Sequence, residues 1–150
     1  MSDKITFKIF RGEPDEDGDP FGRLVDYTVD LDEGMVVLDV IHRIQAEHSP
    51  DLACRWNCKA GKCGSCSAEI NGHPKLMCMT RMEEVLEEME DSNEPVLVKP
   101  MQAFPLVRDL VTDTSWAYKT DKRIEPINGP EEPDWVFHQQ EADRLQEFRS

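Results

Sequence analysis

The sequence predicts an α+β fold in which a small mixed sheet packs on one helix. Apolar and polar residues alternate over residues 5–10 and again over about 23–31, as in half-buried strands. Apolar residues then recur at helical spacing over about 37–48, where Ser49-Pro50 ends the pattern. The strands bury one face, and the amphipathic helix is the element that can cover it.

Two turns are predicted between the strands. Residues 11–22 are rich in Gly, Pro and Asp and predict a turn region after the first strand. Residues 67–70 and 75–77 flank Asn71-Gly72, a dipeptide favoured in tight hairpins. The sequence therefore predicts a second hairpin, separate from the first.

An acidic run and a last strand complete the predicted domain. Seven carboxylates over residues 83–94 predict a solvated helix or a surface excursion. The apolar run that follows, residues 95–100, is bounded by prolines and predicts a short strand. The order of these elements is that of a β-grasp domain, which we place at residues 1–104.

The chain changes character after this domain. Apolar spacing predicts a connecting helix over about 105–118, and a Pro-rich stretch predicts an extended linker over 125–134. A last amphipathic segment covers about 136–148. Because these pieces hold too little apolar material for a core of their own, residues 105–150 are expected either to wrap the first domain or to pack against something outside this chain.

Composition excludes some classes of function. With 17 basic and 31 acidic residues in 150, the net charge is −14, which argues against a nucleic-acid partner. The acidity suits docking on basic protein patches and equally suits solubility alone. The longest apolar run, residues 35–38, is too short to span a bilayer, and no secretory signal is visible. We therefore expect no direct membrane span and a cytoplasmic location, where thiols stay reduced.

The spacing of four cysteines predicts a [2Fe–2S] cluster. Four thiolates give each of two irons two ligands, and the spacing C-x4-C-x2-C…C is that of plant-type sites. Gly61 and Gly64 lie between ligands, where a residue without Cβ lets the backbone curl around the cluster. Backbone N–H groups, Ser65 and Lys59 are expected to donate to it. The predicted cofactor and metal ligands are Cys58, Cys63, Cys66 and Cys78.

Other metal and redox sites fit the spacing less well. Structural zinc sites usually use two separated cysteine pairs, whereas three of these ligands share nine residues. A Rieske centre needs two histidines, and His73 is the only one nearby. A redox-active dithiol at Cys63 and Cys66 leaves Cys58 and Cys78 unexplained.

Two residues beside the predicted ligands need separate interpretations. Cys54 is the fifth cysteine and is expected to be an unligated thiol packed under the loop, with exchange for a ligand as the alternative. Trp56 is expected to shield the cluster from water. Phosphate-binding loops, nucleophile elbows and zinc-protease helices are not visible, so the chain by itself shows no catalytic residue.

The motifs resemble those of the iron–sulfur subunits of succinate dehydrogenases and fumarate reductases. The resemblance rests on residues 58–72 (CKAGKCGSCSAEING), on Leu76-Met77-Cys78, and on residues 105–111 (PLVRDLV), where that family begins its connecting helix. The third ligand of the family is sometimes Asp, whereas here it is Cys66. The resemblance implies a β-grasp ferredoxin-like domain of residues 1–104.

The resemblance also implies partners and a location. The family relays single electrons from the FAD of a flavoprotein subunit, through [4Fe–4S] and [3Fe–4S] clusters, to quinone at a membrane-anchor subunit. A chain of this kind lies on the cytoplasmic face of the inner membrane, held there by its partner subunits. As part of such a complex the chain would carry electrons for an enzyme that either oxidises succinate or reduces fumarate.

One departure from the family leaves an alternative open. The family continues into further cysteine motifs, but this sequence has no cysteine after Cys78. The second iron–sulfur domain is therefore expected to lie outside residues 1–150 or on a separate chain, and only the [2Fe–2S] cluster is expected here. The alternative function is a free-standing soluble ferredoxin that shuttles electrons between partners.

Overall fold

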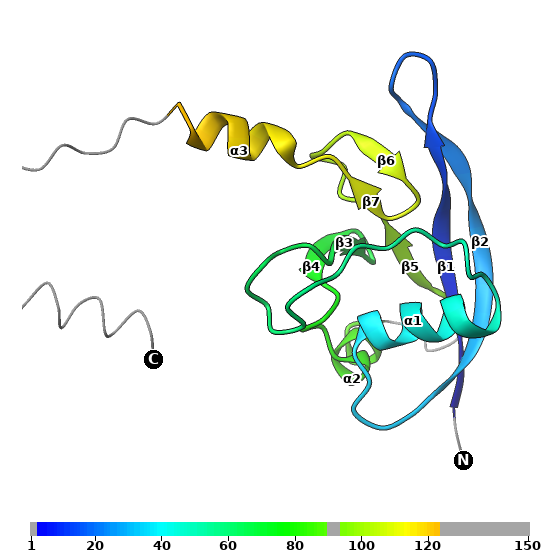
Figure 1. The fold of residues 1–150 in the computed structure, drawn as a ribbon. Helices are drawn as coiled ribbons and strands as arrows, with labels where there is room; N and C mark the ends of the chain where they lie inside the picture. The colour runs from blue at the N-terminus through cyan, green and yellow to red at the C-terminus, as the bar shows by residue number, and fades with distance from the viewer. Residues whose placement is uncertain (1–2, 90–93, 124–150) are drawn as a thin grey trace, which may run out of the picture. The chain divides into compact units, whose positions relative to one another are not determined.

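The main feature of the structure is a five-stranded mixed sheet (Figure 1). The structure is a computed structural model that describes residues 3–89 and 94–123. The strand order is β2-β1-β5-β3-β4, with β1 and β5 parallel and the other neighbours antiparallel. The strands are β1 (Asp3–Pro14), β2 (Pro20–Leu31), β3 (Ser67–Ile70), β4 (His73–Leu76) and β5 (Val96–Lys99).

The helix α1 (Val37–Glu47) covers one face of this sheet. Apolar side chains at every second strand position point toward it, because successive side chains of a strand face opposite sides. The α+β, β-grasp prediction is confirmed, and the predicted helix ends one residue early. The fully buried core includes Phe7, Ile9, Val37, Leu38, Ile41, Ile44, Ile70, Val96 and Val98.

The first hairpin is longer than predicted. Residues 11–22 were expected to form a turn, but β1 and β2 pair as far as Pro14 and Pro20, so only residues 15–19 turn. Gly12 and Gly22 are partners in this ladder, and a Cβ on either would lie under 2.5 Å from a carbonyl oxygen of the opposite strand. The two glycines therefore serve close strand approach rather than a turn.

The second hairpin agrees with its prediction. Asn71 and Gly72 have φ angles of 48° and 81°, the left-handed pair that a type I′ turn requires. The acidic run begins as the short helix α2 (Met82–Glu87), and residues 90–93 lie outside the described part.

The predicted helix over 105–118 is wrong. Its first half is a small hairpin of β6 (Leu106–Arg108) and β7 (Val111–Thr112), and a helix, α3 (Ser115–Asp121), begins only afterwards. Asp109 turns the hairpin with a φ of 49°, outside the range that an α-helix uses. The apolar spacing of this segment reflects burial of Leu106 and Leu110, not a helical face.

The chain divides into two compact units, residues 1–115 and 116–150. The first holds the sheet, α1, α2 and the small hairpin. Of the second, the structure describes residues 116–123, which belong mostly to α3. The predicted linker over 125–134 and the amphipathic segment over 136–148 lie outside the described residues, and the division at residue 104 stays a prediction.

The Asp109 carboxylate joins the small hairpin to the sheet. Its side chain is 3% exposed; Oδ1 accepts from Gly12 N at 2.9 Å and from Arg11 Nε at 3.1 Å, while Oδ2 accepts from Ala53 N at 2.8 Å. Arg11 also donates to the Tyr27 hydroxyl at 2.9 Å. One buried carboxylate therefore connects β1, the small hairpin and the segment that follows α1.

We predict that Asp109→Asn destabilises the fold by about 3 kcal/mol. Asn tolerates a positive φ, so the variant tests the charge and the lost acceptor rather than the turn. Asp51→Asn is the matched control, because Asp51 also accepts from Arg11 but its side chain is 64% exposed. Urea unfolding measures both; a loss at Asp109 no larger than that at Asp51 would contradict the assigned role.

Candidate iron–sulfur site

The four predicted ligands lie in two places in the fold. Cys58, Cys63 and Cys66 belong to a loop of residues 54–66, here called the cluster loop, which runs from beyond α1 to β3 without helix or strand (Figure 1). Cys78 follows β4, on the far side of the second hairpin. Three of the predicted ligands thus lie in one loop, and the fourth lies across a hairpin from them.

Backbone N–H groups of the cluster loop point at ligand sulfurs. Cys58 Sγ accepts from the amides of Ala60, Lys62 and Cys63 at 3.4, 3.3 and 3.3 Å. Cys63 Sγ accepts from the amide of Ser65 at 3.5 Å. Such donors stabilise a thiolate relative to a thiol, so the cluster loop favours negatively charged sulfur at Cys58 and Cys63.

The four thiols form two neighbouring pairs. Cys63 lies within hydrogen-bond reach of Cys58, and Cys66 within reach of Cys78. The Ser65 hydroxyl, with backbone N–H groups and Cys58, lowers the pKa of Cys63 to about 6. Burial raises the pKa of Cys66, and the Cys78 thiol raises it further. Two thiols for each of two irons is the donor arrangement of a [2Fe–2S] cluster.

The pairs differ in exposure. Cys58 and Cys63 are exposed, whereas Cys66 and Cys78 are 3% and 8% exposed and belong to the apolar core. In the described part of the chain, no three His, Cys, Asp or Glu side chains gather around one point as a single bound ion would need. A cluster held by both pairs would therefore have one side toward solvent and one toward the core.

The start of α1 positions Cys78. The N-cap residue of α1 is Val36, whose apolar side chain cannot cap the free N–H groups of the first turn. Instead Val37 N donates to Thr80 O and Leu38 N to Met77 O, each at 3.0 Å. The carbonyls on either side of Cys78 thus replace a side-chain cap and fix its segment to the core.

Two glycines give the cluster loop its curvature. Gly61 and Gly64 have φ angles of 67° and 70°, so the prediction that glycine lets the backbone curl here is confirmed. A Cβ on Gly61 would lie 2.9 Å from Met79 Cγ, whereas nothing lies within 4 Å of one on Gly64. Lys59 adds a third left-handed residue, at φ 52°. Alternating handedness of this kind turns successive N–H groups inward.

Residues outside the cysteine motif hold the start of the cluster loop. Asp109 accepts from Ala53 N, and Leu110 N donates to Ala53 O at 3.2 Å. Arg55 Nη1 donates to Thr112 O at 3.2 Å. Sequence reasoning missed this anchor, because the small hairpin that supplies it was assigned to a helix.

Cys54 and Trp56 have different surroundings. Cys54 is partly buried against the core, and burial with the nearby Cys66 raises its pKa to about 12, as for a packed, unligated thiol. Trp56 is 47% exposed. Its ring meets His42 edge-on at 5.0 Å, and Lys59 Nζ lies 4.5 Å from its centroid. Trp56 therefore braces the loop against α1, a contact that the sequence did not reveal.

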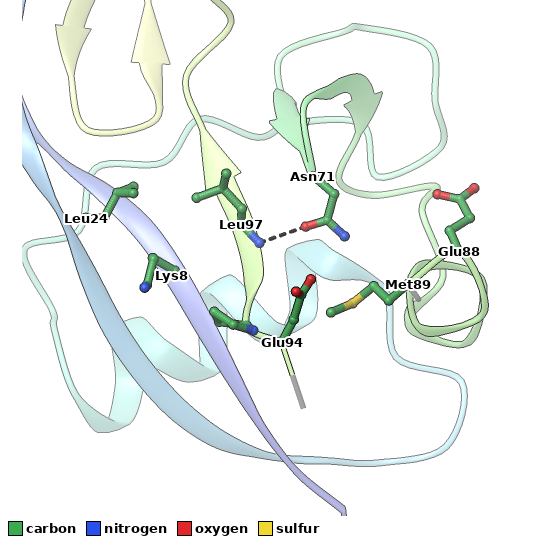
Figure 2. A pocket seen from close by; sticks show the side chains of 8 residues that line it. Lys8, Leu24, Asn71, Glu88, Met89, Glu94 and Leu97 are labelled. Atoms are coloured by element: carbon green, nitrogen blue, oxygen red, sulfur yellow. Dashed lines mark hydrogen bonds between the residues drawn. The ribbon is translucent and has the colours of Figure 1, made fainter. Parts of the chain in front are cut away.

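A separate hollow of about 560 Å³ lies on the face of the sheet opposite α1 (Figure 2). Lys8, Leu24 and Leu97 lie toward one side of it, and Glu88 and Glu94 toward the other. Asn71 Oδ1 accepts from Leu97 N there at 2.8 Å. Since this hollow has no cysteine, the candidate redox site is the cluster loop rather than a cavity.

Comparisons with known proteins agree with the predicted cofactor. A family described as "2Fe-2S iron-sulfur cluster binding domain" matches residues 6–119. The succinate dehydrogenase iron–sulfur subunit of Coxiella burnetii is 31% identical over 131 residues, which are 86% of this chain and 52% of that protein. Its counterpart in Paracoccus denitrificans is 34% identical over 141 residues, 92% of this chain and 51% of that protein.

Solved structures give the same result. A chain of the Mycobacterium smegmatis Sdh1 complex in the apo form matches with a TM-score of 0.81 and 47% identity, over 99% of this chain and 59% of that one. A hypothetical protein from Helicobacter pylori matches with a TM-score of 0.52 at 18% identity, over 100% of this chain and 33% of that one, and shows the fold alone.

The expected resemblance is thus confirmed. This chain spans about half the length of the curated relatives, 52% and 51% of the two named above. The cofactor predicted from the spacing, a [2Fe–2S] cluster, is the one that the matching family binds. The chain belongs to the family of 2Fe–2S iron–sulfur cluster binding domains, in the branch similar to succinate dehydrogenase iron–sulfur subunits.

Proposed function

We propose that this chain carries single electrons in a succinate dehydrogenase or fumarate reductase complex, between the FAD of a flavoprotein subunit and further iron–sulfur clusters and quinone. The observation that carries the proposal is the two pairs of neighbouring thiols, three on the cluster loop with its backbone donors and the fourth, Cys78, after β4. The names of the relatives support the complex, because they are succinate dehydrogenase subunits. The same similarity favours a subunit over a free-standing ferredoxin.

Cys58, Cys63, Cys66 and Cys78 are the proposed ligands, the first two for one iron and the last two for the other. When bound, the cluster accepts and releases one electron at a time. The N–H groups of residues 60, 62, 63 and 65 offset the negative charge that the thiolates confine. The core around Cys66 and Cys78 keeps water from one side, so electrons would cross by the exposed side.

The partners proposed for the whole complex are a flavoprotein subunit, a second iron–sulfur domain or chain, and a membrane-anchor subunit. No helix in the described residues is long and apolar enough to cross a membrane. We place the chain on the cytoplasmic face of the inner membrane, attached through these partners. Residues 1–104 would form the cluster domain, and residues 105–150 would lead toward the second one.

The direct test of the relay uses the loaded full chain and the FAD-containing subunit under anaerobic conditions. We expect succinate plus catalytic amounts of that subunit to produce the EPR signal of the reduced cluster. In the other direction, fumarate together with the same subunit should abolish the EPR signal of the chemically reduced chain. If dithionite changes the EPR signal but neither succinate nor fumarate does, the proposed relay is wrong, although the chain still holds a cluster.

A panel of single Cys→Ser variants tests the ligands. We expect changes at Cys58, Cys63, Cys66 and Cys78 to lower iron content or alter the EPR signal, because a hydroxyl is a poorer ligand than a thiolate. Cys54→Ser is the matched control and should keep about two irons and two sulfides. A normal spectrum in any of the four, or its loss in Cys54→Ser, would revise the ligand set.

A glycine pair tests the curvature of the cluster loop. Gly61→Ala forces a left-handed residue to carry a Cβ against Met79, and we expect faster loss of iron to a chelator. Gly18→Ala changes a left-handed glycine (φ 89°) at the tip of the first hairpin, with nothing within 4 Å of its Cβ. It should lower stability by about 1 kcal/mol and leave iron retention unchanged. Equal iron loss in both would mean that global stability alone governs retention.

A further inference from the structure

The charge of this chain is distributed unevenly. Between Leu52 and Arg81, the segment that carries all four proposed ligands, Glu69 is the one acidic residue. The remaining 120 residues hold 12 basic and 30 acidic residues. The segment is therefore a cationic region in an otherwise strongly anionic protein. Its basic residues are Arg55, Lys59, Lys62, Lys75 and Arg81.

Part of this cationic region surrounds the exposed thiols. Lys62 and Lys59 lie on the cluster loop, and the Lys62 amide donates to Cys58 Sγ. Met79 follows Cys78 and lies against Gly61 while 55% exposed. We call this surface the thiol face; its residues are Trp56, Cys58, Lys59, Lys62, Cys63 and Met79, all of them exposed.

The two lysines of the thiol face have no carboxylate partner among the residues that the structure describes. Lys75, by contrast, lies 2.5 Å from Glu88, and Arg43 lies 2.5 Å from Asp32. Because no carboxylate of the described residues engages either lysine, both ammonium groups can pair with carboxylates of a partner. The thiol face therefore combines exposed apolar groups, Trp56 and Met79, with two lysines that can form such pairs.

We infer that the thiol face docks on an acidic surface of the flavoprotein subunit, with apolar contact at its centre and lysine–carboxylate pairs at its rim. The inference rests on the proposed function and adds the chemistry of the contact. The anionic remainder of the chain would be repelled by the same surface, so the charge distribution also orients the approach. For the thiol face, this inference replaces the expectation from net charge alone that the chain docks on basic patches.

The test compares two substitutions of equal charge change in the loaded full chain. Lys62→Glu reverses a charge on the thiol face; Lys4→Glu does so near the N-terminal end of β1, away from the cluster loop (Figure 1). We expect Lys62→Glu to slow association with the flavoprotein subunit about tenfold at low salt, and the difference to shrink toward 0.5 M salt. Lys4→Glu should change the rate less than about twofold.

Controls separate docking from assembly. Association rates are compared only between chains whose iron content and EPR signal match those of the parent chain. If Lys62→Glu loses iron, Lys62→Gln replaces it, with an expected slowing of about threefold. Equal rates for the Lys62 and Lys4 variants would overturn the inference while leaving the relay intact. Lys62-dependent binding to anionic lipid vesicles, with unchanged flavoprotein association, would also overturn it. A parent chain that exchanges no electrons with the flavoprotein would overturn both proposals.

Discussion

The negative charge that cysteine thiolates bring when they hold a [2Fe–2S] cluster is the constraint on which the rest of this structure depends. Thiolates that share one cluster repel one another unless nearby dipoles offset their charge. The cluster loop supplies amides to Cys58 and Cys63, and it can do so because residues 59, 61 and 64 turn in the left-handed sense. The sulfur-binding geometry is therefore a property of the backbone more than of any side chain except the cysteines.

A loop of this kind needs rigid supports at both ends. At its start, the Asp109 carboxylate and the small hairpin hold Ala53; near the fourth cysteine, the first turn of α1 binds the carbonyls of Met77 and Thr80. Both supports consist of hydrogen bonds to backbone groups of segments that are distant in sequence. The sheet and α1 thus act as the frame that holds Cys78 within hydrogen-bond reach of Cys66.

The sequence predicted what local pattern determines. Alternation, helical spacing, Asn71-Gly72 and the cysteine spacing each gave the correct element or cofactor, because each is set by neighbouring residues. The glycines and prolines of residues 11–22 led to the wrong prediction of a turn, because Gly12 and Gly22 are instead partners in the pairing of β1 with β2. The helix predicted over 105–118 was also wrong. Hydrogen bonds of Asp109 with β1 and Ala53 determine the backbone there, whereas the apolar spacing of the segment does not. Distant partners of this kind leave no local pattern.

The central claim is that this chain holds one [2Fe–2S] cluster on its four paired thiols, and spectroscopy of the anaerobically purified chain tests it most directly. Iron and acid-labile sulfide would be counted, and EPR spectra recorded before and after dithionite. The account predicts about two irons and two sulfides, no signal when oxidised, and a rhombic S = 1/2 signal when reduced. A colourless chain with about one zinc, silent in both states, would contradict it.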